Sequence, residues 1–185
     1  MDTDRPFSHD PRTRIADALE ATLEALRLAR RELAGARAEP ERWRWVALGL
    51  VSAVQAGLIA ALSGYASARH EDVANPSQPD RVAPVSLLLR RARSTEHLNA
   101  PERLDLTGAQ VRDLEALVAM RNAAVHGLGF QVADHPVHLV RTAAEILRHL
   151  LKTHPAFDVS QFVLVLTLID TELTRIVTET TPNDP

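Results

Sequence analysis

The stretch WVALGLVSAVQAGLIAAL, residues 45–62, is a run of 18 residues without a charged side chain. A run of this length lies at the lower limit of what spans a lipid bilayer. Ser52 and Gln55 lie in its middle, and Gly49, Gly57 and several alanines make it only moderately hydrophobic. A helix buried in the core of a domain explains the run better than a membrane span. We therefore expect no membrane contact.

The composition of the whole chain fits one globular domain. With 185 residues, of which 45% are hydrophobic, the chain can bury a substantial core, and it contains no internal duplication. We expect a single domain over residues 1–185, with flexible ends at 1–10 and 179–185. The charged N-terminus lacks the apolar core of a signal peptide, which predicts a cytoplasmic location.

The net charge and the absence of cysteine exclude several classes of function. A net charge of −3 means that the protein as a whole is not a polycation that coats nucleic acid, so any such contact requires a local patch. Without cysteine there are no disulfides, thiolate nucleophiles or cysteine-ligated zinc sites. The chain also contains no Gly-rich phosphate loop and no G-x-S-x-G motif, so a classical nucleotide-dependent enzyme is not expected.

Helical periodicity extends over most of the chain. Apolar stripes with spacings of three and four residues predict helices over about 10–38, 41–67, 83–94, 107–128, 134–154 and 160–178. Thr107 and Asp134 are the expected N-caps of two of these helices, and Gly127 with Gly129 is expected to end the one that Thr107 begins. Residues 70–80 predict a loop, and no stretch requires a strand. The predicted fold is all-α, an antiparallel bundle of five to six helices.

The segment MRNAAVHG, residues 120–127, places three polar side chains in the helix predicted to begin at Thr107. The apolar stripe of this helix comprises Val111, Leu114, Val118, Val125 and Leu128. Arg121 occupies the position that completes this stripe. Asn122 and His126 are four residues apart and share one edge of the helix.

An arginine on a buried stripe needs partners for its charge and its donors. In one interpretation, the guanidinium of Arg121 reaches the surface, or it donates hydrogen bonds to Ser52, Gln55 or a helix C-terminus inside the bundle. A bound anion would satisfy it in the other, and a phosphate suits the guanidinium fork best.

His126 and Arg121 together have the groups needed to cleave a phosphodiester without a metal. Histidine titrates near neutral pH and can take a proton from a nucleophilic hydroxyl, while an arginine stabilises the charged phosphate of the transition state. RNA supplies its own nucleophile, the 2′-hydroxyl. The alternative is that His126 is a helix-end residue that contacts backbone carbonyl groups.

The sequence RNAAVH, Arg121 to His126, resembles the Arg-polar-x-x-x-His signature of HEPN domains, α-helical proteins that include many bacterial toxin and defence ribonucleases. The resemblance covers the order of helices over residues 41–178. It implies cleavage of RNA such as tRNA or mRNA without metal or other cofactor, with His126 as general base or proton shuttle. The resemblance also implies that Arg121 stabilises the charged phosphate and that Asn122 orients either Arg121 or His126.

The same resemblance has implications for partners. HEPN domains typically form homodimers in which the motifs of two chains line a shared cleft. A toxin of this type would have an antitoxin, for example a small nucleotidyltransferase. Because many HEPN domains are inactive, the alternative is a catalytically silent module that dimerises or binds nucleotide or a protein partner.

A cluster of arginines is the best candidate for RNA contact. Residues 81–103 contain five arginines and two glutamates, a local charge of +3 in an acidic protein. We expect Arg90, Arg91 and Arg93 to bind the RNA backbone, with an affinity that falls as salt rises. The alternative is a solvated helix face. No aromatic residue interleaves the cluster, so base stacking on aromatic rings is not expected.

Two helical pairs have the spacing of metal ligands. Glu145 and His149 are four residues apart, and His135 and His138 are three apart. A metal site in a helical bundle needs matching pairs on other helices, and the sequence lacks them. We therefore expect no metal site.

Overall fold

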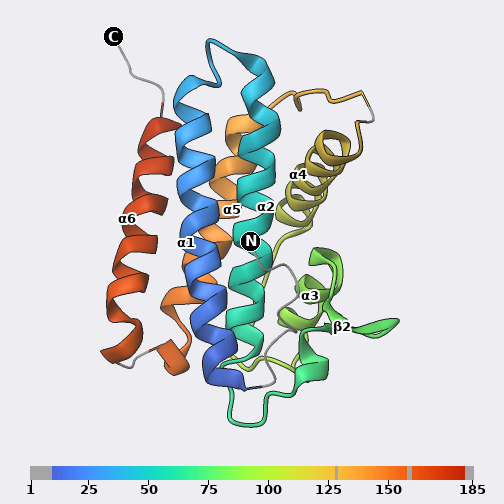
Figure 1. The fold of residues 1–185 in the computed structure, drawn as a ribbon, viewed down its shortest axis with the longest axis vertical. Coiled ribbons are helices and arrows are strands. Elements are labelled where there is room, and N and C mark those ends of the chain that lie inside the picture. The colour runs from blue at the N-terminus through green and yellow to red at the C-terminus, as the bar shows by residue number, and fades with distance from the viewer. Residues whose placement is uncertain (1–9, 128, 158–159, 182–185) are drawn as a thin grey trace.

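The computed structural model describes residues 10–127, 129–157 and 160–181. In this part of the chain the all-α prediction is confirmed, since the structure contains six α-helices and one small two-stranded sheet (Figure 1). The α-helices are α1 (Pro11–Gly35), α2 (Trp43–Leu62), α3 (Val85–Ala92), α4 (Gly108–His126), α5 (Pro136–Lys152) and α6 (Val163–Glu179). The strands are β1 (Ala74–Asn75) and β2 (Gln78–Val82). Single turns of 3₁₀ helix lie at Pro40–Arg42, His70–Asp72, Pro155–Phe157 and Ser160–Phe162.

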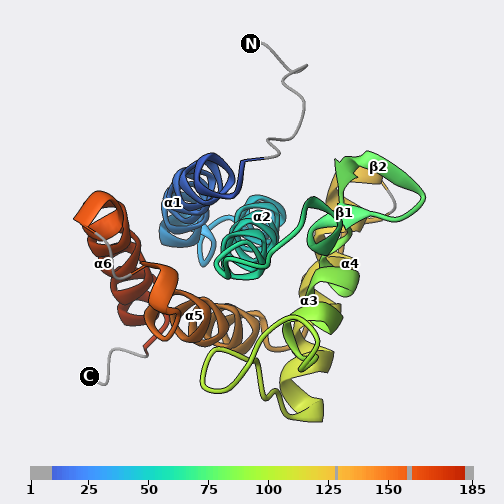
Figure 2. The same ribbon diagram turned by 90° about the horizontal axis from the view of Figure 1, so that it is seen from below.

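Helix α2 is the centre of the fold. Helices α1, α3, α4 and α5 all pack against it, as the view along the helices shows (Figure 2). By length and composition α2 could cross a membrane, but 72% of its most apolar window is buried inside the protein. Leu50, Val54 and Leu58 are almost completely inaccessible to solvent. The prediction of a buried core helix over residues 45–62 is confirmed.

Glycine allows α1 and α2 to pack closely. A Cβ atom at Gly49 would lie 2.8 Å from the carbonyl oxygen of Ala25 and 2.9 Å from the amide nitrogen of Ala29. Helix α6 covers the other side of α1 (Figure 1). There the Nε atom of Arg30 donates to Glu172 at 2.6 Å and joins the two helices.

The ends of α4 form as the sequence predicts. The side chain of Thr107 accepts a hydrogen bond from the amide of Gln110, and the Gln110 side chain accepts one from the amide of Thr107. This reciprocal capping box fixes the first turn of the helix. At the other end Gly127 has a φ of 66°, the left-handed conformation that glycine adopts without strain. The predicted end at Leu128 lies outside the described residues.

Other predicted boundaries were wrong. Helix α1 ends at Gly35 rather than near Ala38, and α2 spans Trp43–Leu62 rather than 41–67. Asp134 does not cap α5, because Pro136 occupies the first helical position and the N-cap is therefore His135, which makes no side-chain capping bond.

The prediction that no strand is required was wrong for part of residues 70–80. Strands β1 and β2 pair antiparallel in a short hairpin that projects from the helices (Figure 2). Both faces of β2 are largely exposed, so its sequence has no alternation of apolar and polar residues to reveal it. The Nη1 atom of Arg91 donates to the carbonyl oxygens of Asp72 and Ala74, at 3.1 and 2.9 Å, and ties the hairpin to α3.

The predicted flexible ends fall partly on residues that the structure describes. Residues 1–9 and 182–185 lie outside the described residues. Asp10 caps α1 by accepting a hydrogen bond from the amide of Thr13. Thr180 is buried, and its carbonyl oxygen accepts a hydrogen bond from Arg141 at 2.8 Å. Both residues therefore belong to the folded unit.

Candidate functional site

The apolar stripe of α4 faces a surface groove as well as the core. The buried residues of the helix are Leu114, Leu117 and Met120. Val111 and Val118 line the groove instead, and Val125 is 54% exposed. The expectation of a buried stripe was therefore wrong at Val125. Val125 lies in the last turn of α4, beyond Asn122, which is the last α4 residue of the groove lining.

The groove is lined by residues of α3 and α4 and has a volume of about 430 Å³. In Figure 1, α3 lies below α4. Its apolar lining consists of Val85, Leu89, Val111, Leu114, Val118 and Ala119. Its polar lining consists of Ser86, Arg90 and Arg93 on the α3 side and Glu115 and Asn122 on the α4 side. The groove thus combines apolar walls with charged and polar groups from both helices.

Three charged side chains of this lining are available to a ligand. Arg90, Arg93 and Glu115 are exposed. None of them forms a hydrogen bond or an ion pair with any other described residue. A guanidinium without an intramolecular partner can bind a phosphate without first giving up a bond.

Asn122 connects the motif to this groove. The Nη1 atom of Arg121 donates to the Oδ1 atom of Asn122 at 3.0 Å, and Asn122 is also part of the groove lining. Both side chains are half-buried. Neither core residue named as a partner of Arg121 is available inside the core. Gln55 donates to the carbonyl oxygen of Ala83, and Ser52 is exposed to solvent.

His126 is exposed in the last turn of α4. The α4 residues of the groove follow spacings of three and four, ending with Val118, Ala119 and Asn122. His126 comes four residues after Asn122 and therefore continues this face one turn farther along the helix. Of the three motif residues, Asn122 lines the groove, Arg121 is hydrogen-bonded to Asn122, and His126 lies one turn beyond Asn122 on α4.

The three arginines predicted to contact RNA have different environments. Arg90 and Arg93 line the groove, whereas the half-buried Arg91 is hydrogen-bonded to the hairpin. Burial lowers the pKa of Arg91 from its usual value, against the opposing effect of Asp72. The sequence treats these residues alike, but the structure brings only two of them to the motif.

Sequence reasoning missed Glu115 as part of the site. The signal that could have found it is its spacing, because Glu115 precedes Asn122 by seven residues, two helical turns, on the same face of α4.

Comparison with known proteins identifies no relative from which a function could be inferred. No family model matches the chain, and no curated protein or solved structure is significantly similar to it. What the groove can bind and what the motif can do therefore follow from the residues themselves.

Two of the three histidines considered as metal ligands, His138 and His149, make other contacts. His138 lies 3.1 Å from the carboxylate of Asp113, and the Nε2 atom of His149 lies 3.3 Å from the carbonyl oxygen of Arg103. Among residues 10–127, 129–157 and 160–181, no three histidine or acidic side chains gather as a metal site.

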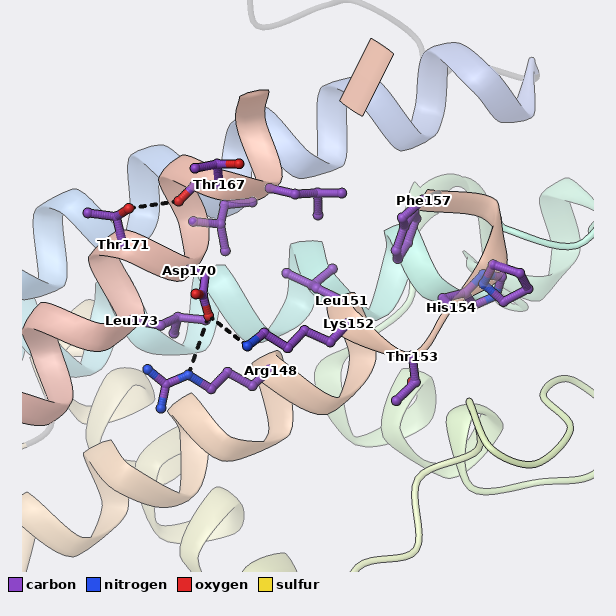
Figure 3. A pocket seen from close by; sticks show the side chains of 13 residues that line it. Arg148, Leu151, Lys152, Thr153, His154, Phe157, Thr167, Asp170, Thr171 and Leu173 are labelled. Carbon is purple, nitrogen blue, oxygen red and sulfur yellow. Dashed lines mark hydrogen bonds and ion pairs between the residues drawn. The ribbon is translucent and has the colours of Figure 1, made fainter. Parts of the chain in front are cut away.

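A second cavity, of about 530 Å³, lies between α5 and α6 (Figure 3). Its charged groups pair with one another, since Asp170 lies 3.4 Å from Lys152 and 3.7 Å from Arg148. At its other end His154 is buried against Phe157, and burial lowers the pKa of this imidazole. Because the cations are already neutralised, this cavity is a weaker candidate for binding an anion than the α3–α4 groove.

Proposed function

We propose that this protein is a metal-independent endoribonuclease of the HEPN type, an antiparallel helical bundle that binds RNA along the α3–α4 groove. The observation that supports this most is the position of Asn122. It accepts a hydrogen bond from Arg121 and lines the same groove as Arg90 and Arg93. A strand held by these two arginines would pass directly beside the motif.

In this proposal each polar side chain has a separate task. Arg90 and Arg93 bind phosphates of the RNA backbone, which guanidinium groups hold by paired hydrogen bonds. Arg121 stabilises the charge that develops on the phosphate being cleaved. Asn122 orients the Arg121 guanidinium through their 3.0 Å hydrogen bond.

His126 acts as the base in the reaction. It removes the proton of the 2′-hydroxyl, and the 2′-oxygen forms a bond to the adjacent phosphorus as the bond to the 5′-oxygen breaks. His126 then gives the proton that it has accepted to the leaving 5′-oxygen, so it acts as a proton shuttle. The products are a 2′,3′-cyclic phosphate and a 5′-hydroxyl, and every step uses groups of the protein and the RNA alone.

The proposal includes a homodimer formed at the motif end of α4. Val125, in the last turn of α4, is 54% exposed, and Trp45, in the first turn of α2, is 48% exposed. Figure 1 shows these two helix ends at the same end of the molecule. We infer that both side chains belong to the dimer contact, since contiguous exposed apolar surface favours protein binding. We expect a dimer in light scattering, and a monomer for Val125→Asp; a monomeric wild-type protein would contradict this part of the proposal.

The biological setting is part of the same proposal. We infer a cytoplasmic toxin or defence effector that acts on tRNA or mRNA and has no membrane contact. Its activity would be restrained by an antitoxin, for example a small nucleotidyltransferase. Co-purification of the two proteins when expressed together tests the partner, and free recovery of each would contradict it.

The test of the activity is cleavage of labelled tRNA and mRNA in EDTA. We expect the wild-type protein to cleave and Arg121→Ala and His126→Ala to lose roughly 10²- to 10⁴-fold in rate. Matched controls are Arg37→Ala and His135→Ala, which remove exposed residues outside the groove. A wild-type protein without cleavage would favour the silent binding module, and equal rates in all variants would attribute the cleavage to a contaminant.

A further inference from the structure

The α3–α4 groove offers more than phosphate contacts. Its volume of about 430 Å³ lies within the range of roughly 300–1,000 Å³ that holds small-molecule ligands. Phosphates would engage the arginines, but they make no use of an apolar surface. Val85, Leu89 and Val118 form such a surface. A flat, weakly hydrated group such as a nucleobase fits it better than a phosphate does.

Glu115 is the unexpected member of this surface. Its carboxylate is exposed on the α4 wall and forms no hydrogen bond or ion pair within the described residues. A carboxylate repels a phosphate, so it weakens a groove that binds only the RNA backbone. It is favourable where the ligand presents N–H donors, because an ionised carboxylate is purely an acceptor. Glu115 therefore points to a donor-bearing part of the ligand.

We propose that the groove binds a guanine base of the RNA strand, with the two carboxylate oxygens of Glu115 accepting from the N1–H and the N2 amino group. This inference rests on the proposed function for the identity of the ligand as RNA. Guanine alone presents two adjacent donors on its Watson–Crick edge. Adenine and cytosine place an acceptor beside the amino donor, and uracil places its single donor between two acceptors.

Asn122 complements this arrangement. Its Oδ1 atom accepts from Arg121, which leaves the Nδ2 amide hydrogens for the ligand. The O6 atom of guanine, next to N1, is an acceptor that suits these hydrogens. Glu115 and Asn122 lie seven residues apart on the same helical face. The same residue that orients Arg121 would thus help to select the base beside the cleaved bond.

Binding to RNA that cannot be cleaved tests the proposal. We would measure fluorescence anisotropy with 2′-O-methyl heptanucleotides of sequence UUUXUUU, in which the nucleophile is blocked and X is each base in turn. We expect the wild-type protein to bind the guanine oligonucleotide roughly tenfold more tightly than the others, the order of discrimination of one bidentate pair. Glu115→Gln should reduce the guanine preference to about twofold or less and strengthen the binding of the adenine oligonucleotide, because the donor and acceptor of adenine match an amide. Glu20→Gln, which changes an exposed glutamate on α1, should keep the preference.

The possible failures are distinguishable. Equal binding of the four oligonucleotides, absence of binding, or a guanine preference that survives Glu115→Gln would each overturn the subsite. A guanine preference without cleavage of the matching RNA would support the guanine subsite and refute the ribonuclease. Cleavage without a guanine preference would support the ribonuclease and refute the guanine subsite. Thermal unfolding of Glu115→Gln should match the wild type, since the side chain is exposed.

Discussion

Alanine substitution of the three arginines Arg90, Arg91 and Arg93 should separate a structural residue from two ligand-binding residues. Arg91 donates hydrogen bonds of 3.1 and 2.9 Å to two carbonyl oxygens of the hairpin segment. Hydrogen bonds to charged groups contribute about 1.5–3 kcal/mol, so we expect Arg91→Ala to cost about 2 kcal/mol of the free energy of unfolding. For a chain of this size that lowers Tm by roughly 4–8 °C. Arg90→Ala and Arg93→Ala should change stability by less than about 0.5 kcal/mol.

The RNA affinities should show the opposite pattern. Each phosphate contact to a single strand contributes about 0.7 to the slope of log affinity against log salt concentration. A fourfold rise in salt therefore weakens the wild-type complex by about 2.6-fold more than a complex that lacks one contact. We expect this smaller slope for Arg90→Ala and Arg93→Ala, and the wild-type slope for Arg91→Ala at temperatures where it is folded.

Circular dichroism melts and fluorescence anisotropy with a labelled RNA over a salt series measure both quantities. Arg37→Ala, at an exposed position outside the groove, is the control for loss of one positive charge. The reasoning is refuted if Arg91→Ala melts like the wild type. It is also refuted if removing Arg90 or Arg93 leaves the salt slope unchanged.

Two further predictions concern the core. Gly49→Ala should lower the free energy of unfolding by about 1–3 kcal/mol in urea denaturation, because the new methyl group would overlap the backbone of α1 at Ala25. The control Gly108→Ala, whose new methyl group meets only an ordinary contact, should leave the free energy of unfolding unchanged. Equal effects of the two substitutions would contradict the close packing of α1 and α2. Burial lowers the pKa of His154, so the unfolded chain binds a proton at higher pH than the folded protein. Stability should therefore fall as pH drops below the unfolded value of about 6.5. In His154→Phe, the free energy of unfolding should fall less between about pH 7 and 5 than in the wild type. An unchanged pH dependence would show that other groups cause the fall.

The elements that the sequence predicts well are those specified by neighbouring residues. The uncharged run of 45–62 indicates burial by its composition alone, and it became the central helix α2. Thr107 and Gly127 specify the ends of α4 because capping depends on residues within one turn. Asp134 was a wrong N-cap because Pro136 moved the helix start by one residue.

The elements that the sequence does not predict depend on distant partners. The hairpin of β1 and β2 is tied to Arg91, which follows it along the chain, and β2 has no periodic pattern of its own. The spacing of Val111, Val118 and Val125 identifies one face of α4 but not whether another helix covers it. The tertiary arrangement decides that Val111 and Val118 of this face line an open groove with residues of α3.

In the candidate site, too, some features follow from neighbouring residues and others from distant ones. Arg121, Asn122 and His126 are visible in the sequence as a motif, and helical geometry places Asn122 and His126 on one edge. Arg90 and Arg93 of the α3 segment line the same groove as Asn122 of α4 only because of the tertiary arrangement. Arg91 could not be distinguished from its neighbours until its hydrogen bonds were known.

The RNA ends produced in EDTA by the wild-type protein and by His126→Ala are the most direct test of the proposed ribonuclease. The proposed reaction predicts 2′,3′-cyclic phosphate and 5′-hydroxyl ends from the wild type and almost none from the variant. Ends with a 3′-hydroxyl, cleavage that persists in His126→Ala, or no cleavage by the wild type would contradict it.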